Sequence, residues 1–195
     1  MARPPVPYDF LPAVGSFTVI SNDVHDGEML AMPQVSGIFG AGGEDISPHL
    51  VWSGAPRETQ SFAVTCFDPD APTGSGFWHW VVYDIPAEVQ ELASGAGTAD
   101  GSALPDGAKQ LRNDGGLYGY LGSAPPAGHG PHRYIIAVHA LSTATLPINE
   151  QASPAVCGFN MFANTLARAL ITPIYEQTQA PDGIIIAGST TTHGD

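Results

Sequence analysis

One stretch, from Phe62 to Pro86, constrains the fold of this chain more than any other part of the sequence. It contains two apolar runs, Phe62–Phe67 and Trp78–Ile85, whose β-branched and aromatic residues predict strands. The segment between them, DPDAPTGSG, can be neither helix nor central strand, because its two prolines lack amide donors and its two glycines loosen the chain. Both faces of the first run are largely apolar, so we expect that strand to lie inside a sandwich or under a second layer.

The overall composition favours a single β-rich domain. Hydrophobic residues make up 43% of the 195 residues and charged residues only 13%, which argues against disorder and allows a sizeable core. The 23 glycines and 18 prolines favour an all-β or loop-rich architecture over a helical bundle. We therefore expect one domain over residues 1–195, with residues 1–13 as an extended, proline-rich arm and residues 181–195 as a tail.

Two more strands and a helix are predicted outside this stretch. Ser16–Ile20 alternates and is typical of a strand, and His132–Leu141 is the second strongest strand pattern in the chain. Apolar residues then recur at every fourth position, at Phe162, Leu166, Leu170 and Ile174. This spacing predicts a C-terminal helix that begins at Asn160 as N-cap and ends before Pro173. Gly183–Ala187 is expected either to form a short strand or to pack as an arm.

Charge and cysteine usage exclude several classes of function. The net charge is −13, and the six basic residues are scattered singly, so no basic patch is available for nucleic acid, and an anionic membrane would repel the protein. No run of roughly 18 apolar residues predicts a transmembrane segment, and the N-terminus lacks the apolar run of a signal peptide. We therefore expect a cytoplasmic protein. Cys66 and Cys157 belong to no Cys-x-x-Cys pair and are interpreted as reduced, small hydrophobic residues, with a single disulfide as the alternative.

The residues that could carry chemistry lie where loops meet strands. Asp68 and Asp70 stand at one end of the DPDAPTGSG loop and His79 at the other, while His132 and Tyr134 open a strand after another Gly/Pro loop. Alternation predicts two strand faces, one with His79, Val81, Tyr83 and Ile85 and one with His132, Tyr134, Ile136 and Val138. If the two strands are neighbours, both histidines meet at one end, beside the two aspartates.

These side chains leave three kinds of site open. A histidine that an aspartate keeps protonated can donate to phosphate or carboxylate oxygens, Asp/His sets can bind zinc or iron, and an Asp–His pair can activate water or a serine. A purely structural interpretation is at least as common, because an Asp-Pro-Asp turn usually caps backbone amides and a histidine at a strand start is usually structural. The remaining histidines carry no local pattern and are expected to be structural or exposed: His25, His49, His129, His139 and His193.

Several motifs, taken in order, resemble the phosphatidylethanolamine-binding protein family, and in particular the bacterial branch often called Raf-kinase-inhibitor-like proteins. The resemblance extends from about Ser16 to Gln177. The motifs that carry it are Asp68–Pro72 (DPDAP), Phe77–Val82 (FWHWVV), Ala124–Pro126 (APP) and Gly130–Tyr134 (GPHRY), with Ser47–Gly54 (SPHLVWSG) and Asn113–Gly115 (NDG) in support.

The resemblance implies an antiparallel β-sandwich with a few peripheral helices and a small anion-binding pocket at one end. In the family this pocket accepts phosphate-type head groups. Matching the motifs residue by residue assigns the pocket to Asp68, Asp70, His79, Pro125, Pro126, His132 and Tyr134. The bacterial relatives also suggest a homodimer. This chain departs from the family in its short loop after DPDAP, and its one basic residue beside the site, Arg133, should point to the strand face opposite His132.

The leading hypothesis is therefore a non-enzymatic protein that binds a small anionic or phosphorylated ligand, without a cofactor or metal, and that modulates a protein partner such as a kinase. One alternative is an Asp/His-based or metal-dependent hydrolase, although the sequence contains neither Gly-x-Ser-x-Gly nor His-Glu-x-x-His. Another is a protease inhibitor, which is an activity known in the family, although nothing in the sequence identifies an inhibitory loop.

Overall fold

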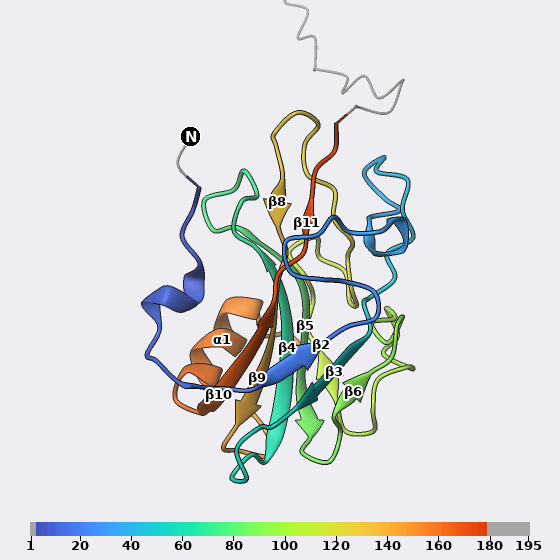
Figure 1. Cartoon of the computed structure of the whole chain (residues 1–195). Coiled ribbons are helices and arrows are strands. Elements are labelled where there is room, and N and C mark those ends of the chain that lie inside the picture. Colours follow the sequence, from blue (N-terminus) through green and yellow to red (C-terminus); the bar gives the residue numbers. More distant parts are fainter. Residues whose placement is uncertain (1–2, 179–195) are drawn as a thin grey trace, which may run out of the picture.

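The computed structural model describes residues 3–178, and its centre is a six-stranded, mostly antiparallel sheet (Figure 1). The strands lie in the order β1 (Gly15–Ser16), β10 (Thr165–Ile171), β9 (Ile135–Leu141), β4 (Ser61–Asp68), β5 (Phe77–Pro86) and β7 (Lys109–Gln110). Only β1 pairs in parallel, with β10. The predicted strands of the Phe62–Pro86 stretch are thus adjacent and form the middle of the sheet.

Two smaller sheets and three helical segments complete the fold. A three-stranded sheet contains β2 (Thr18–Ile20), β3 (Leu50–Ser53) and β6 (Glu91–Leu92), and a two-stranded one contains β8 (His132–Arg133) and β11 (Ile174–Tyr175). The helical segments are the 3-10 helices η1 (Pro7–Phe10) and η2 (Met32–Gln34) and the α-helix α1 (Pro154–Phe162). No helix among residues 3–178 combines the length and the apolar character that crossing a bilayer requires.

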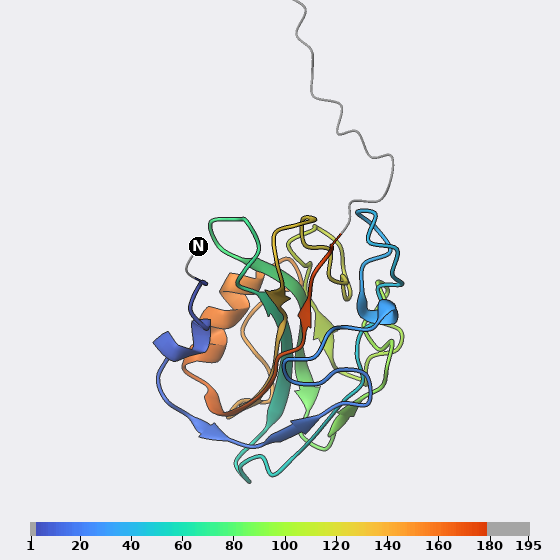
Figure 2. The same ribbon diagram turned by 45° about the horizontal axis from the view of Figure 1, so that its top comes forward.

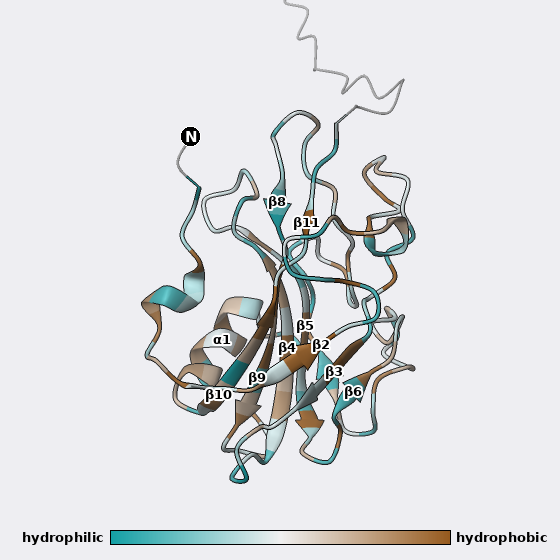
Figure 3. Ribbon diagram, viewed as in Figure 1, coloured by the Kyte–Doolittle hydropathy of each residue, from teal (hydrophilic) through white to brown (hydrophobic). Residues whose placement is uncertain are grey.

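The two faces of the central sheet pack against different layers, which confirms the predicted β-sandwich. One face packs on the three-stranded sheet, where Trp52 and Leu92 contact a cluster that includes Val64 and Val138. The other face is covered by α1, whose Cys157 packs near Ala63. All eight residues of β4 are buried, as its doubly apolar pattern predicts. In Figure 3 the strands β9 and β10 are accordingly mainly hydrophobic, whereas β5 also contains hydrophilic stretches. Cys66 and Cys157 are both free and buried.

The predicted C-terminal helix is wrong in its position. The helix begins earlier, at Pro154, because Ser153 is the N-cap and its Oγ accepts a hydrogen bond from the amide of Val156, while proline suits the first helical turn. Residues Thr165–Ile171 form β10, which pairs with β9. A spacing of four is also a multiple of two, so Leu166 and Leu170 satisfy the strand period as well as the helix period. The small residues between them settle the structure, because Ala167, Ala169 and Ile171 fit into the buried face of the sheet.

The prediction that His79, Val81, Tyr83 and Ile85 share one face of β5 is also wrong, because the pairing of β5 with β4 contains two irregularities. Opposite Cys66 and Phe67 of β4 stand Trp80 and Trp78, so His79 is an extra residue without a partner in β4. A second shift follows near Asp84, which has a positive φ of 55°. Such bulges turn side chains to the other face of a sheet. As a result Val81 and Tyr83 pack toward α1, Ile85 packs on the opposite face, and His79 faces the pocket described below.

The other predicted elements are confirmed in part. His132–Leu141 is extended but is divided at Tyr134, where β8 leaves the central sheet to pair with β11. β9 and β5 are not neighbours, because β4 lies between them. The arm of residues 1–13 is not wholly extended, since it contains η1, which lies beside α1 in both Figure 1 and Figure 2. The short strand or arm expected at Gly183–Ala187 and the predicted tail of residues 181–195 lie outside the described residues.

Candidate functional site

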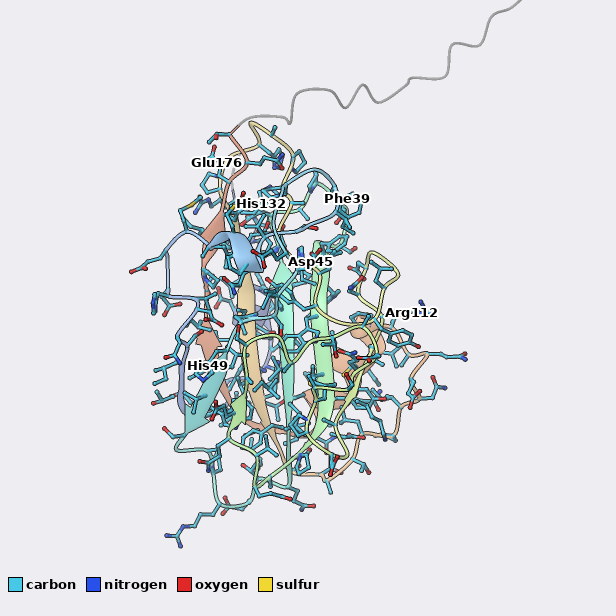
Figure 4. The ribbon with its side chains drawn as sticks, turned by 90° about the vertical axis from the view of Figure 1, so that its right-hand side faces the viewer. Phe39, Asp45, His49, Arg112, His132 and Glu176 are labelled. Atoms are coloured by element: carbon cyan, nitrogen blue, oxygen red, sulfur yellow. The ribbon has the colours of Figure 1, made fainter. Side chains whose placement is uncertain are left out.

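A cavity of about 250 Å³ opens at the end of the sandwich where β4, β5 and β8 meet their loops. Figure 4 shows two residues near it, His132 and Phe39, at the same end of the molecule. Six of the seven residues assigned to a pocket from the sequence line this cavity: Asp68, His79, Pro125, Pro126, His132 and Tyr134. The seventh, Asp70, does not line it. The fold therefore brings His79 of β5 and His132 of β8 to one cavity, although β4 lies between β5 and β9, the strand that follows β8.

Asp68, the last residue of β4, has two roles at once. Its Oδ1 accepts hydrogen bonds from the amides of Asp70 and Ala71 at 2.7 and 3.0 Å, which is the turn-capping role expected of an Asp-Pro-Asp segment. Its Oδ2 lies 2.7 Å from Nδ1 of His132. The carboxylate is buried, so it orients the imidazole inside the protein rather than offering a free charge to a ligand. The structural and the functional interpretation of this motif are thus compatible.

His132 belongs to a hydrogen-bonded chain that the sequence did not reveal. Its Nδ1 faces Asp68, and its Nε2 lies 2.7 Å from Nδ1 of His129 in the loop before β8. The two rings also contact each other edge to face, with their centroids 5.0 Å apart. His129 was expected to be structural or exposed, and its spacing of three residues from His132 is no strand period, so only the tertiary turn brings them together. Both ring nitrogens of His132 therefore have partners.

His79 is held differently, by the backbone. Its Nδ1 lies 2.7 Å from the carbonyl oxygen of Leu121, so Nδ1–H donates to that oxygen and Nε2 remains as an acceptor. Burial lowers the pKa of His79 below its usual value, although the Leu121 carbonyl and the charge of Asp68 oppose this. The ring packs against Phe77 and Tyr134, with centroids 4.8 and 5.1 Å away. At neutral pH the imidazole is therefore uncharged.

Tyr134 contributes a hydroxyl that has no hydrogen-bond partner. Its side chain is buried, and neither its hydroxyl nor that of Ser123 forms a hydrogen bond of acceptable geometry among the described residues, although Ser123 is near enough to lower the pKa of the tyrosine. Burial and the charge of Asp68 outweigh this effect and raise the pKa far above its usual value. The hydroxyl thus stays protonated, and a buried donor without a partner is a natural contact for a ligand oxygen.

Asp70 is bound to Arg133 instead of to a histidine. Its Oδ2 accepts from the backbone amide and Nε of Arg133 at 2.9 and 2.7 Å, and its Oδ1 accepts from Nη2 at 2.7 Å. Burial alone would raise the pKa of Asp70, but the hydrogen bonds from Arg133 hold it below its usual range. Nη2 also donates to the carbonyl of Pro4, at 2.6 Å. Arg133 thus points away from His132, as alternation predicts, and fastens the N-terminal arm to the DPDAP turn.

The rim is formed by a loop that the sequence did not assign to the site. Phe39 lies against the cavity and has a positive φ of 58°. Asp45 holds this loop in place, because its Oδ2 accepts from the amide of Gly37 at 2.9 Å and its Oδ1 accepts from that of Gly122 at 2.7 Å. Gly122 itself lines the cavity. The glycine-rich segment before Asp45, GIFGAGG, has no local pattern that relates it to the cavity.

The cavity therefore offers few charges and several polarised groups in a rigid, largely apolar wall. Pro125, Pro126, Phe77 and Leu121 supply the apolar surface, and the two imidazoles and the Tyr134 hydroxyl supply the polar atoms. Among residues 3–178, no three or more His, Cys, Asp or Glu side chains are arranged to hold a metal ion. A volume of about 250 Å³ is slightly below the usual range for drug-sized ligands, so it suits a small head group.

Comparison with known proteins gives consistent matches. The family model described as phosphatidylethanolamine-binding protein matches residues 20–176. The protein YbcL of Escherichia coli is 48% identical over 167 residues, which cover 86% of this chain and 91% of YbcL. YbhB of the same organism is 49% identical over 157 residues, covering 80% and 98%. The crystal structure of YbcL, described as a new member of the mammalian PEBP family, superposes with a TM-score of 0.81 at 49% identity and covers 83% of this chain and 99% of that one.

Proposed function

The chain belongs to the phosphatidylethanolamine-binding protein family, and from this premise we propose that its pocket binds a small anion of the phosphate-monoester type, such as the head group of a phospholipid. The observation that carries the proposal is the pair of unsatisfied polar atoms in one small cavity. Within residues 3–178 the Tyr134 hydroxyl has no hydrogen-bond partner, and the His79 ring bonds to the Leu121 carbonyl through Nδ1, which leaves Nε2 for a ligand. A phosphate group can accept from the first and, once the imidazole is protonated, from the second.

The pocket's surroundings support this ligand class. His132 is oriented by Asp68 and can exchange its contact with His129 for one with a ligand oxygen, since His129 is part of a loop. The proline rim does not need to be ordered on binding, which reduces the entropic cost. The −13 net charge opposes the approach of an anion from a distance, so we expect weak affinity, in the millimolar to high micromolar range by order of magnitude.

The first test is Tyr134→Phe, which removes one oxygen from the pocket. Because that hydroxyl has no hydrogen-bond partner within residues 3–178, the free energy of unfolding should change by no more than about 0.5 kcal/mol. The affinity for inorganic phosphate and for phosphoethanolamine should fall about tenfold, because a hydrogen bond to a charged ligand is lost. Titrations followed by NMR on the ring signals of His79 and His132 measure both affinities. The proposal fails if millimolar phosphate shifts neither ring in the wild type.

The second test is the pH dependence of anion binding. The pKa of His79 lies below its usual value, so the imidazole takes up its proton only below about pH 6.5 in the free protein. An anion binds the protonated form better, so affinity should rise as pH falls, by roughly tenfold between about pH 8 and pH 5.5. Sulfate is the appropriate probe, because its own charge does not change in this range.

The control for this experiment is His79→Gln, which keeps a polar side chain but cannot titrate. In this variant the affinity for sulfate should hardly depend on pH. If the variant retains the full pH dependence of the wild type, another group takes up the proton, and the assignment to His79 is incorrect. Calorimetric titration at several pH values measures the affinity and, from buffers of different ionisation enthalpy, the protons taken up.

Catalysis, cellular location, oligomeric state and a protein partner are further parts of the proposed function. We propose a non-enzymatic protein of the cytoplasm that forms a homodimer and modulates a protein partner, for which a kinase is the example that the family resemblance suggests. The Asp68–His132–His129 chain is the observation that would favour an enzyme instead, because it can carry a proton. Hydrolysis of phosphate esters that disappears in His132→Asn would overturn the non-enzymatic proposal.

A further inference from the structure

A second cavity, of about 460 Å³, lies on the opposite face of the central sheet, between the N-terminal arm and α1. Both Figure 1 and Figure 2 show η1 beside α1 there. Its walls are mainly apolar and are contributed by Pro7, Tyr8 and Leu11 of the arm, by Trp78, and by the α1 residues Ala155, Gly158, Phe159, Met161 and Phe162. Phe159 and Phe162 are 79% and 55% exposed, so much apolar surface at this groove remains uncovered.

A single cation, Arg168 of β10, lines this apolar groove. Its guanidinium stacks on the ring of Tyr8, with Cζ 4.4 Å from the ring centroid, and its Nε donates to Nδ1 of His139 at 3.4 Å. No described carboxylate pairs with it, and neither Nη group makes a hydrogen bond within residues 3–178. Burial lowers the pKa of Arg168 from its usual value, but a guanidinium stays charged at any physiological pH.

A buried network fixes the position of this guanidinium. His139 is buried, and its burial together with the neighbouring Arg168 lowers its pKa to about 3, so the imidazole is neutral and its Nδ1 can accept from Arg168. Its Nε2–H then donates to the hydroxyl oxygen of Thr65 at 3.3 Å, and that hydroxyl is 3.1 Å from the hydroxyl of Tyr8. The network satisfies Nε of Arg168 and leaves the Nη groups available.

The absence of a described counter-ion beside Arg168 is unexpected in this protein. The chain has 19 acidic and only 6 basic residues, so acids outnumber bases threefold. Lys109 and Arg133 are each paired with an aspartate, Asp84 and Asp70. The other three basic residues also have no described carboxylate partner, but they are exposed to water, whereas Arg168 is half-buried: Arg3, Arg57 and Arg112. A half-buried charge without a partner costs free energy unless an anion from outside neutralises it.

A guanidinium without a described counter-ion thus lies in an apolar groove. From this juxtaposition we propose that the groove between η1 and α1 binds a fatty acid. The carboxylate would lie on Arg168, and the alkyl chain would lie along Leu11, Phe159 and Phe162. An extended peptide fits this groove less well, because its backbone amides and carbonyls would face apolar side chains and lose their hydrogen bonds. An alkyl chain has no such groups. The site lies on the sheet face opposite the anion pocket and does not depend on the function proposed for that pocket.

The test uses the full chain and decanoate below its micellar concentration. Decanoate should bind, whereas decyltrimethylammonium, which has the same chain and the opposite charge, should bind at least about tenfold more weakly. Lengthening the acid by two methylenes should tighten binding roughly five- to tenfold until the groove is full, because each buried methylene adds to the apolar transfer free energy. Isothermal titration calorimetry measures these affinities.

Two variants locate the site. Arg168→Gln should weaken decanoate about tenfold or more but change the binding of neutral 1-decanol by less than about twofold. Gly158→Leu fills the groove, since a Cβ at Gly158 meets no atom within 4 Å, and it should abolish binding of both ligands while the helix is kept or stabilised. Circular dichroism and thermal melting verify that both variants fold.

Tyr134→Phe is the matched control in the anion pocket and should leave decanoate binding unchanged. The proposal is overturned if decanoate does not bind the wild type, if Arg168→Gln binds decanoate as well as the wild type, or if phosphate competes with decanoate. It is also overturned if Gly158→Leu converts a dimer into monomers and decanoate leaves the wild-type dimer intact, because the groove would then be covered by a second copy of the chain.

Discussion

Replacing Asp68 with alanine is expected to lower the free energy of unfolding by about 3–5 kcal/mol and to abolish phosphate binding. The reason is that one buried carboxylate accepts three hydrogen bonds, from the amides of Asp70 and Ala71 and from Nδ1 of His132. Removing it leaves the buried His132 donor and two part-buried amides without an acceptor, and it lets the His132 ring rotate. Urea denaturation measures the loss of stability, and a phosphate titration of the folded variant measures the loss of binding.

Asp68→Asn is the matched control, because its carboxamide oxygen can still accept from the two amides of the turn. It should cost only about 1–2 kcal/mol, since only the contact with His132 is changed from acceptor to donor. It should nevertheless weaken phosphate binding about as much as alanine does. Equal destabilisation by both variants would mean that the His132 contact, and not the turn, carries the stability. A fully stable Asp68→Ala would show that the carboxylate is dispensable for the fold.

Gly122→Ala should strongly damage the wall of the cavity at the end of the sandwich, with a loss of about 3 kcal/mol or more in the free energy of unfolding. A Cβ at this position would overlap the carbonyl carbon of Val35 and lie 2.5 Å from the amide nitrogen of Ser36. These are backbone atoms that cannot move easily, because the carbonyl of Val35 accepts from the amides of Glu44 and Asp45, and the amide of Ser36 donates to the carbonyl of Ser123.

Gly122→Ala should also weaken phosphate binding about tenfold, because it displaces the hydrogen bond between the carboxylate of Asp45 and the amide of Gly122 in the cavity wall. Gly74→Ala is the control in the loop on the other side of the cavity, where an added Cβ meets no atom within 4 Å. It should change the free energy of unfolding by no more than about 0.5 kcal/mol. Thermal and urea denaturation of both variants provide the comparison. If Gly122→Ala is as stable as Gly74→Ala, the loop of residues 37–45 adjusts freely and does not position the rim.

The family motifs predicted most of the residues that line the cavity at the end of the sandwich, but not how these residues interact. Both aspartates were expected to be partners for the histidines, and the structure bears this out for Asp68 only, since Asp70 binds Arg133. The two carboxylates are only two residues apart, and nothing local shows which one turns inward. The backbone turn that Asp68 itself caps directs Asp70 to the side of Arg133. The role of His129 required the tertiary turn before β8.

Two predictions, the C-terminal helix and the face of β5, are wrong for the same reason, because both depend on how one strand pairs with another. The apolar spacing of four at Leu166 and Leu170 fits a strand as well as a helix, and only pairing with β9 selects the strand. The expected face of β5 fails because His79 is an extra residue in the ladder, and a bulge is a property of two paired strands, not of one sequence segment.

The sequence by itself determined the strands around the DPDAPTGSG loop, because hydrophobic patterning, proline and glycine are local properties. Its ordered family motifs implied the β-sandwich class and six residues that line the cavity at the end of the sandwich. Only the tertiary structure decided which face each histidine presents, which carboxylate orients His132, and that Arg168 lies in an apolar groove without a described counter-ion. These depend on strand register and on contacts between segments far apart in the chain, such as η1 and α1, for which a single sequence carries no signal.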